Sequence, residues 1–69
     1  MNEIKRMLLM DSLVRHYVEI LTAATEEERI SAEKYAETSC EDLSAKDRKT
    51  SMQWARQEVR RAVGVRPVA

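Results

Sequence analysis

Glycine and proline are almost absent from this chain, and where they occur restricts the fold more than any other feature. The sequence has one glycine, Gly64, and one proline, Pro67, both near its C-terminal end. Strand-rich domains of this length normally need several glycines in their turns, whereas strong helix formers dominate here. The sequence therefore predicts an all-α fold. A chain with a single glycine also has no glycine-rich loop to cradle a phosphate group.

Residues 2–24 project as a helix with an unusually wide apolar face. An ordinary surface helix carries an apolar stripe a little over 100° wide, whereas this face covers about 180°. Because one partner helix cannot cover so wide a face, we expect a second copy of the chain to cover the remainder. The residues expected in the core of this homodimer are Met10, Leu13, Val14, Tyr17, Val18 and Leu21.

The rest of the chain predicts a helical hairpin. Nothing between Ala23 and Ala36 breaks a helix, so one long helix is predicted over about residues 3–38, with a kink near residues 24–25. Two separate helices are the alternative, because Thr25 followed by Glu28 matches the capping-box pattern. Residues 38–43 are expected to form the turn. Two such hairpins would associate into a four-helix-type bundle.

The second predicted helix covers about residues 44–63. Ser44, with Asp47 three positions later, is a suitable N-terminal cap. Gly64 is expected to end this helix as its C′ residue. Residues 64–69 are expected to form a flexible tail.

The size of the chain favours self-association. A 69-residue chain forms a single domain whose core typically contributes only a few kcal/mol, roughly 3–5 at best. The lone Cys40 excludes an intrachain disulfide, is typical of a reducing compartment, and is expected to be an inert thiol. Neither a signal peptide nor an apolar run of membrane-spanning length is evident. We therefore expect a cytoplasmic protein without a membrane partner, stabilised by its own second copy.

Charge is balanced in sum but divided along the chain. Twelve basic and twelve acidic residues give a formal net charge of zero. Residues 25–43 carry seven acids and two bases, whereas residues 44–69 carry seven bases and two acids. We expect the basic helix to run back along the acidic one, so that the two stretches attract each other. The alternatives are a partner protein of complementary charge, or a nucleic acid that contacts Lys49, Arg56 and Arg60.

Trp54 is the strongest candidate for a contact residue. It projects roughly 80° or more away from the apolar side of its helix, among Asp47, Glu58 and Arg61. Trp and Arg are enriched at binding hot spots, which favours a role in partner binding. Burial against the dimer mate or the long helix is the alternative for Trp54. The full set of predicted partner-binding residues is Trp54, Arg61, Glu58, Arg56, Leu8 and Arg15.

No arrangement of residues indicates catalysis, a cofactor or a metal. His16 and Glu19 form a His-x-x-Glu pair, but on the polar face of the first helix, so we expect a solvated histidine. Metal sites in helical bundles instead project inward from several Glu and His residues. Ile4 also projects on this polar side, together with Leu8. We therefore expect a protein that is not an enzyme and needs no cofactor.

In its short length, helical character and richness in charge, the chain resembles the small helical accessory proteins encoded by phages, such as anti-quorum-sensing and anti-CRISPR proteins. This resemblance implies a binding function by occlusion of a partner. Together with the expected dimer, it predicts a homodimeric module that binds a cellular protein, such as a host regulator, stoichiometrically and modulates or inhibits it. A small nucleic-acid-binding transcriptional regulator that uses the basic C-terminal helix is the alternative.

Overall fold

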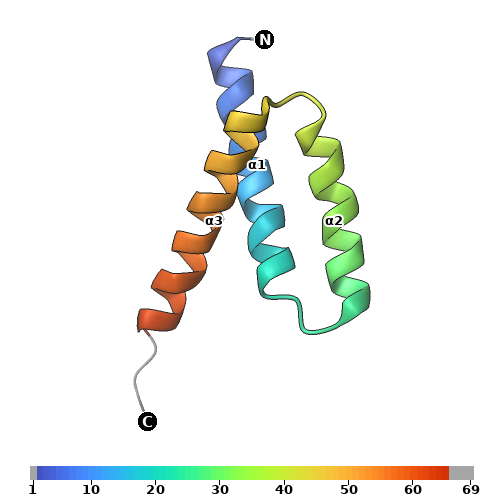
Figure 1. Ribbon diagram of the computed structural model, residues 1–69, viewed down its shortest axis with the longest axis vertical. Coiled ribbons are helices and arrows are strands. Elements are labelled where there is room, and N and C mark those ends of the chain that lie inside the picture. The colour runs from blue at the N-terminus through green and yellow to red at the C-terminus, as the bar shows by residue number, and fades with distance from the viewer. Residues whose placement is uncertain (1, 66–69) are drawn as a thin grey trace.

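The computed structural model describes residues 2–65, which form three α-helices and no strand. The helices are α1 (Glu3–Leu21), α2 (Glu26–Cys40) and α3 (Ala45–Val65) (Figure 1). The predicted all-α fold is thus confirmed. The predicted single helix over residues 3–38 is wrong, because the chain leaves the helix after Leu21 and starts a new one at Glu26.

Local hydrogen bonds and charge explain the break between α1 and α2. The Thr22 hydroxyl donates to the Val18 carbonyl oxygen at 2.7 Å. The Thr25 hydroxyl accepts from the Glu28 amide at 3.2 Å, and the Glu28 carboxylate accepts from the Ala24 amide at 3.1 Å. Three acids in the first turn of α2 also favour a helix N-terminus at this point. These interactions satisfy amide groups that a helix start would otherwise leave unpaired.

The start of α3 agrees with the prediction, whereas its end does not. The Ser44 hydroxyl accepts from the Asp47 amide at 3.1 Å, so Ser44 caps the helix as expected. Gly64 does not end the helix, since α3 continues to Val65 and no described glycine has a positive φ. Gly64 is therefore an ordinary helical residue and not part of a tail. The rest of the predicted tail, residues 66–69, lies outside the described residues.

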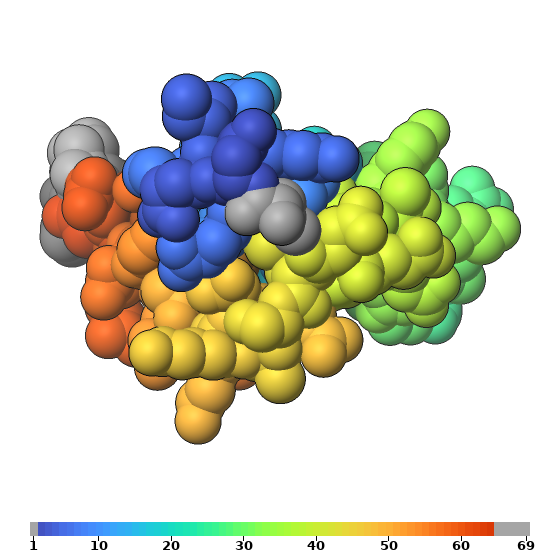
Figure 2. Space-filling model, turned by 90° about the horizontal axis from the view of Figure 1, so that it is seen from above, coloured from blue at the N-terminus to red at the C-terminus, as the bar shows by residue number. Residues whose placement is uncertain are grey.

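α1 lies between the other two helices. It packs against α2 on one side and α3 on the other, while α2 and α3 make almost no contact with each other. Seen from above, the green α2 and the orange α3 flank the blue start of α1 (Figure 2). α2 runs back along α1, whereas α3 starts near the upper part of α1 and then diverges from it (Figure 1).

The core of this arrangement is small. Its buried apolar side chains include only three large ones, Met10, Leu13 and Leu43, among the described residues. Three buried alanines, at positions 32, 36 and 55, allow α2 and α3 to approach α1 closely. Several half-buried side chains surround this core. They are Leu9, Tyr17, Ile20 and Cys40.

The residues predicted for a dimer core divide into two groups. Met10 and Leu13 are already buried within a single chain, and Tyr17 packs against the same core. Val14 and Val18 are half-buried, and Leu21 remains 43% exposed. Only the second group is left for another molecule to cover. Dimerisation itself remains a prediction.

The expected attraction between acidic and basic helices is not found inside the chain. The prediction assumed a two-helix hairpin, in which the two charged stretches would be neighbours, whereas α1 separates α2 from α3. Among the described residues, a single ion pair joins two helices, namely Arg6 of α1 with Asp47 of α3. The other ion pairs each lie within one helix.

Candidate functional site: a groove between α1 and α3

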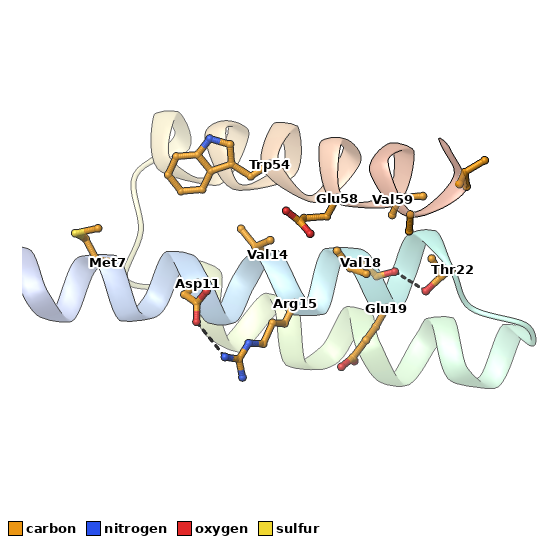
Figure 3. Close-up of a pocket in the computed structure, with 12 residues that line it drawn as sticks. Met7, Asp11, Val14, Arg15, Val18, Glu19, Thr22, Trp54, Glu58 and Val59 are labelled. Carbon is orange, nitrogen blue, oxygen red and sulfur yellow. Dashed lines mark hydrogen bonds and ion pairs between the residues drawn. The ribbon is translucent and has the colours of Figure 1, made fainter. Parts of the chain in front are cut away.

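An open groove of about 870 Å³ runs between α1 and α3, and we call it the Trp54 groove (Figure 3). Its α1 wall consists of Met7, Asp11, Val14, Arg15, Val18, Glu19 and Thr22. Its α3 wall consists of Trp54, Glu58, Val59, Ala62 and Val63. The floor is thus mainly apolar, and charged side chains stand along its edges.

The groove exists because α3 is fixed to α1 only near its own start. The guanidinium of Arg6 donates two hydrogen bonds to the Asp47 carboxylate, at 2.9 and 3.1 Å. One turn later, the Ser51 hydroxyl is fully buried and donates to the Asp47 carbonyl oxygen at 2.8 Å. Ala55 is also fully buried, so the two helices are close together at this level.

Beyond Ala55 the apolar side chains between the diverging helices are short. Val14 and Val18 point from α1 toward α3, and Val59 points from α3 toward α1 (Figure 3). Ala62 also lines this part of the groove. Valine and alanine do not reach far enough to fill the widening space. Val59 is half-buried as a result, while Ala62 and Val63 are exposed. The apolar floor is therefore open to another molecule.

Trp54 lies on the edge of α3 that faces this groove. The residue is 46% exposed, in agreement with the prediction that it lies away from the core. Its ring is placed above the stretch of α1 between Met7 and Val14 (Figure 3). The largest apolar side chain of the protein is therefore available at the surface, next to other apolar groups.

The charged edges of the groove are organised by local ion pairs. Arg15 pairs with Asp11 at 3.3 Å on α1, and Arg61 pairs with Glu58 at 3.3 Å on α3. The Glu58 side chain points from α3 toward α1 (Figure 3). All four side chains are largely exposed, so these pairs contribute little stability and can rearrange when a partner binds.

The structure brings together some of the predicted partner-binding residues and separates others. Trp54, Glu58 and Arg15 line the Trp54 groove, and Arg61 stands at its edge through its pair with Glu58. Leu8 is 65% exposed on α1, next to the groove residue Met7. Arg56 does not line the Trp54 groove and instead lines a second one.

This second groove, of about 490 Å³, has a basic edge. Its lining comprises Tyr17, Cys40, Ala45, Arg48, Lys49, Met52, Gln53 and Arg56. Two of the three predicted nucleic-acid contacts, Lys49 and Arg56, meet here, whereas Arg60 is not part of the lining. The Tyr17 hydroxyl lies 3.5 Å from the Cys40 sulfur. Burial, together with the Cys40 interaction, raises the pKa of Tyr17 to about 12.

His16 departs from its predicted environment. It was expected to be solvated, but its side chain is half-buried and stacks on Tyr35 of α2, with ring centroids 5.7 Å apart. Its Nε2 lies 3.4 Å from the Ser12 hydroxyl, and its Nδ1 lies 3.8 Å from a Glu19 carboxylate oxygen. The break after Leu21 explains this, because it lets α2 fold back and cover this face. Residues 2–64 hold no cluster of metal-ligating side chains.

The sequence interpretation missed the apolar floor of the groove as a site. Val14 and Val18 are predicted for the dimer core, and Met7 is not among the predicted site residues. The signal was nevertheless present, since a face of about 180° is too wide for one neighbouring helix. In the structure α2 and α3 cover most of this face and leave the Trp54 groove open.

None of the three described helices is long and apolar enough to cross a lipid bilayer. Comparisons of the chain with protein-family models, with curated proteins and with solved structures found no match.

Proposed function

We propose that the protein is a non-enzymatic interaction module that takes an apolar helix of another polypeptide into the Trp54 groove. The observation that carries this proposal is the half-exposed Trp54 at the edge of an open, mainly apolar groove. Aromatic side chains at such positions contribute much of the binding energy in protein interfaces.

The dimensions of the groove suit a helix. Its α1 wall extends from Met7 to Thr22, which is about 22 Å at 1.5 Å per residue, or roughly four helical turns. A groove between two diverging helices can take the apolar stripe of a third, which is a common mode of peptide recognition. The partner helix would present side chains that repeat every three or four residues.

The edges of the groove favour a partner with some positive charge. Asp11, Glu19 and Glu58 stand against a single base, Arg15, in the groove lining. A basic side chain beside the apolar stripe of the partner would therefore complement the groove. Such complementarity contributes mainly to specificity and to the association rate.

We further propose that binding is stoichiometric and inhibits a cellular target. The general resemblance to small phage-encoded accessory proteins supports a host regulator as this target. When a helix of the regulator is bound in the groove, the surface of that helix is blocked, and the regulator cannot use it for its own contacts.

Site-specific photo-crosslinking tests the proposal. A photoreactive phenylalanine analogue replaces Trp54 in one variant and Tyr35, an exposed aromatic of α2 outside the groove, in a matched control. After irradiation in the source cells, position 54 should give protein adducts that map to an apolar helix, and position 35 should not. Equal adducts at both positions, or none at position 54, would contradict the proposal.

A second candidate function rests on the other groove. Arg48, Lys49 and Arg56 gather around Tyr17 and Met52, which could serve a nucleic-acid backbone beside an apolar surface. In that case DNA or RNA affinity would fall steeply with salt and would be lost when Lys49 and Arg56 are both replaced by Ala. Unretarded nucleic acid at low salt would exclude this candidate.

A further inference from the structure

We infer that α1 of a second copy of this chain fills the Trp54 groove in the free protein, giving an antiparallel homodimer. The inference rests on the proposed function, since it names the helix that the groove takes. In a dimer with a two-fold axis, both copies use the same surface. Each copy therefore has to provide a groove and also the helix, here called the guest, that fills the groove of the other copy. α1 meets this requirement, because it forms one wall of the groove and also carries an uncovered apolar stripe.

The stripe has the spacing of a coiled-coil seam. Ile4, Met7, Asp11, Val14 and Val18 follow one another at alternating intervals of three and four residues. All but Ile4 line the groove. Contrary to its predicted place on the polar side, Ile4 lies one turn before Met7 and extends the stripe toward the N-terminus of α1. Ile4 is 75% exposed and Met7 is 60% exposed, so nothing within the chain covers this end.

Charge within the stripe selects the antiparallel orientation. Asp11 is the only charged member, and Arg15 stands one turn after it at 3.3 Å. A parallel pair would place the two Asp11 carboxylates side by side. An antiparallel pair that sets Met7 against Val18 sets Asp11 against Val14, within reach of Arg15 of the second copy. The acid in an otherwise apolar seam then acquires a partner across the interface.

The flanks of the groove agree with this orientation. In the antiparallel pair, the exposed start of α1 lies at the wide end of the opposite groove, where Val59, Ala62 and Val63 are uncovered. The guest thus supplies the apolar stripe that the groove favours.

The small core of the chain also favours a second copy as the occupant of the Trp54 groove. Among the described residues, three large apolar side chains are buried, whereas eight are exposed. Domains of this size commonly rely on association or another constraint for stability. With zero formal net charge, two copies approach without overall repulsion. An external target helix would then have to displace α1 of the second copy.

The first experiment measures the association constant of the full chain by sedimentation equilibrium. Ile4→Lys tests the stripe, and Ile30→Lys, a matched change at an exposed isoleucine of α2, is the control. We expect a dimer at micromolar concentrations, weakened at least about tenfold by Ile4→Lys and unchanged by Ile30→Lys. Circular dichroism should show that both variants keep their helices. Equal association of Ile4→Lys and the wild-type chain would exclude α1 as the guest.

A charge exchange tests the orientation. Arg15→Asp alone should weaken the dimer, because two acids would then face each other across the seam. Combining it with Asp11→Arg should restore most of the association constant. Failure of the exchange to restore association would overturn the antiparallel register.

The oligomeric state separates this inference from the proposed function. A wild-type chain that stays monomeric well above micromolar concentrations overturns the inference. If position 54 nevertheless crosslinks to a helix of a different protein, the proposed function stands without the dimer. A chain that stays monomeric and whose position 54 crosslinks to no protein would contradict both the inferred dimer and the proposed function.

Discussion

The two interfaces of α1 use similar residues to different effect. On α2, Ala32 and Ala36 are both buried against α1, and Tyr35 stacks on His16 beside them. On α3, Ala55 is buried, whereas Ala62, two turns later, is exposed. Alanine is therefore buried throughout the interface between α1 and α2, whereas between α1 and α3 it is buried at one level and exposed at another. What differs is that α3 is fixed near its start by Arg6 and Asp47 and then diverges.

Stability and binding therefore depend on different parts of the molecule. The buried side of α2 and the first half of α3 hold the three helices together. The part of α3 after Ala55 contributes little to the core, and together with Trp54 it forms the α3 wall of the groove. Substitutions of the same kind should therefore have unequal effects at the two interfaces.

The largest effect is expected at Leu13, which is fully buried on α1. Leu13→Ala should lower the free energy of unfolding by about 3–5 kcal/mol, because it removes core contacts and leaves a cavity. Since a chain of this size has little stability to lose, the variant should be largely unfolded in the absence of a partner. Urea titration followed by circular dichroism measures this, with Leu21→Ala as the exposed control. A folded Leu13→Ala variant would show that the core lies elsewhere.

Replacing an alanine by leucine should have different effects at the α1–α2 interface and in the Trp54 groove. Ala36→Leu should cost about 1–3 kcal/mol, because the larger side chain forces α2 away from α1. Ala62→Leu should change the free energy of unfolding of the monomer, measured below the concentrations of self-association, by less than about 0.5 kcal/mol, since Ala62 faces the open groove. Thermal unfolding of the two variants side by side gives the comparison. Equal costs would mean that the Trp54 groove is filled in solution by the chain itself.

The fixed end of α3 should weaken in acid. Hydrogen bonds from Arg6 lower the pKa of Asp47 below its ordinary value of about 4. Because the pKa is lowered in the folded state, the contribution of Asp47 is complete above the unfolded pKa and is lost as pH falls through the folded pKa. The difference in urea midpoint between the wild-type chain and Asp47→Asn should therefore shrink below about pH 4.

The control for this experiment is Asp42→Asn, a change at an exposed acid in the loop before α3. Its midpoint should follow that of the wild-type chain at every pH. A difference between wild type and Asp47→Asn that stays constant from neutral to acid pH would show that the Arg6–Asp47 pair does not stabilise the fold.

A small effect on stability is expected at Trp54. Trp54→Ala should cost no more than about 1 kcal/mol in the monomer, against roughly 3–5 kcal/mol for a core aromatic residue. The reason is that the side chain packs against one wall of an open groove. Urea titration at concentrations below those of self-association measures it. A loss as large as that of a core tryptophan would move Trp54 from the binding surface to the core.

The helical class and several helix ends could be predicted from the sequence because they depend on local chemistry. The scarcity of glycine and proline, and the caps at Ser44 and Thr25, act within a few residues of where they stand. The break after Leu21 was visible in the capping-box pattern at Thr25 and Glu28. It was outweighed by the continuous apolar periodicity on both sides, which two successive helices can also share.

The candidate site could be predicted only in part, because it depends on how far two helices diverge. The exposure of Trp54 agrees with its predicted position away from the core, whereas the apolar neighbours that it has in the groove were not predicted. The groove itself arises from the Arg6–Asp47 contact between residues 41 positions apart, and no local pattern reveals such a contact. For the same reason the prediction of a solvated His16 is wrong. Tyr35 stacks on the His16 ring only because α2 folds back along α1.

The position of α1 between α2 and α3 has an electrical consequence. α2 carries five acids and two bases, and α3 carries six bases and two acids, so opposite charges lie on the two flanks of a molecule whose formal sum is zero. The protein is therefore a permanent electric dipole rather than an evenly neutral particle. Near its isoelectric point of about 6.6, dipoles of neighbouring molecules attract end to end, and dissolved salt weakens that attraction. Its solubility should thus rise with added salt before it falls.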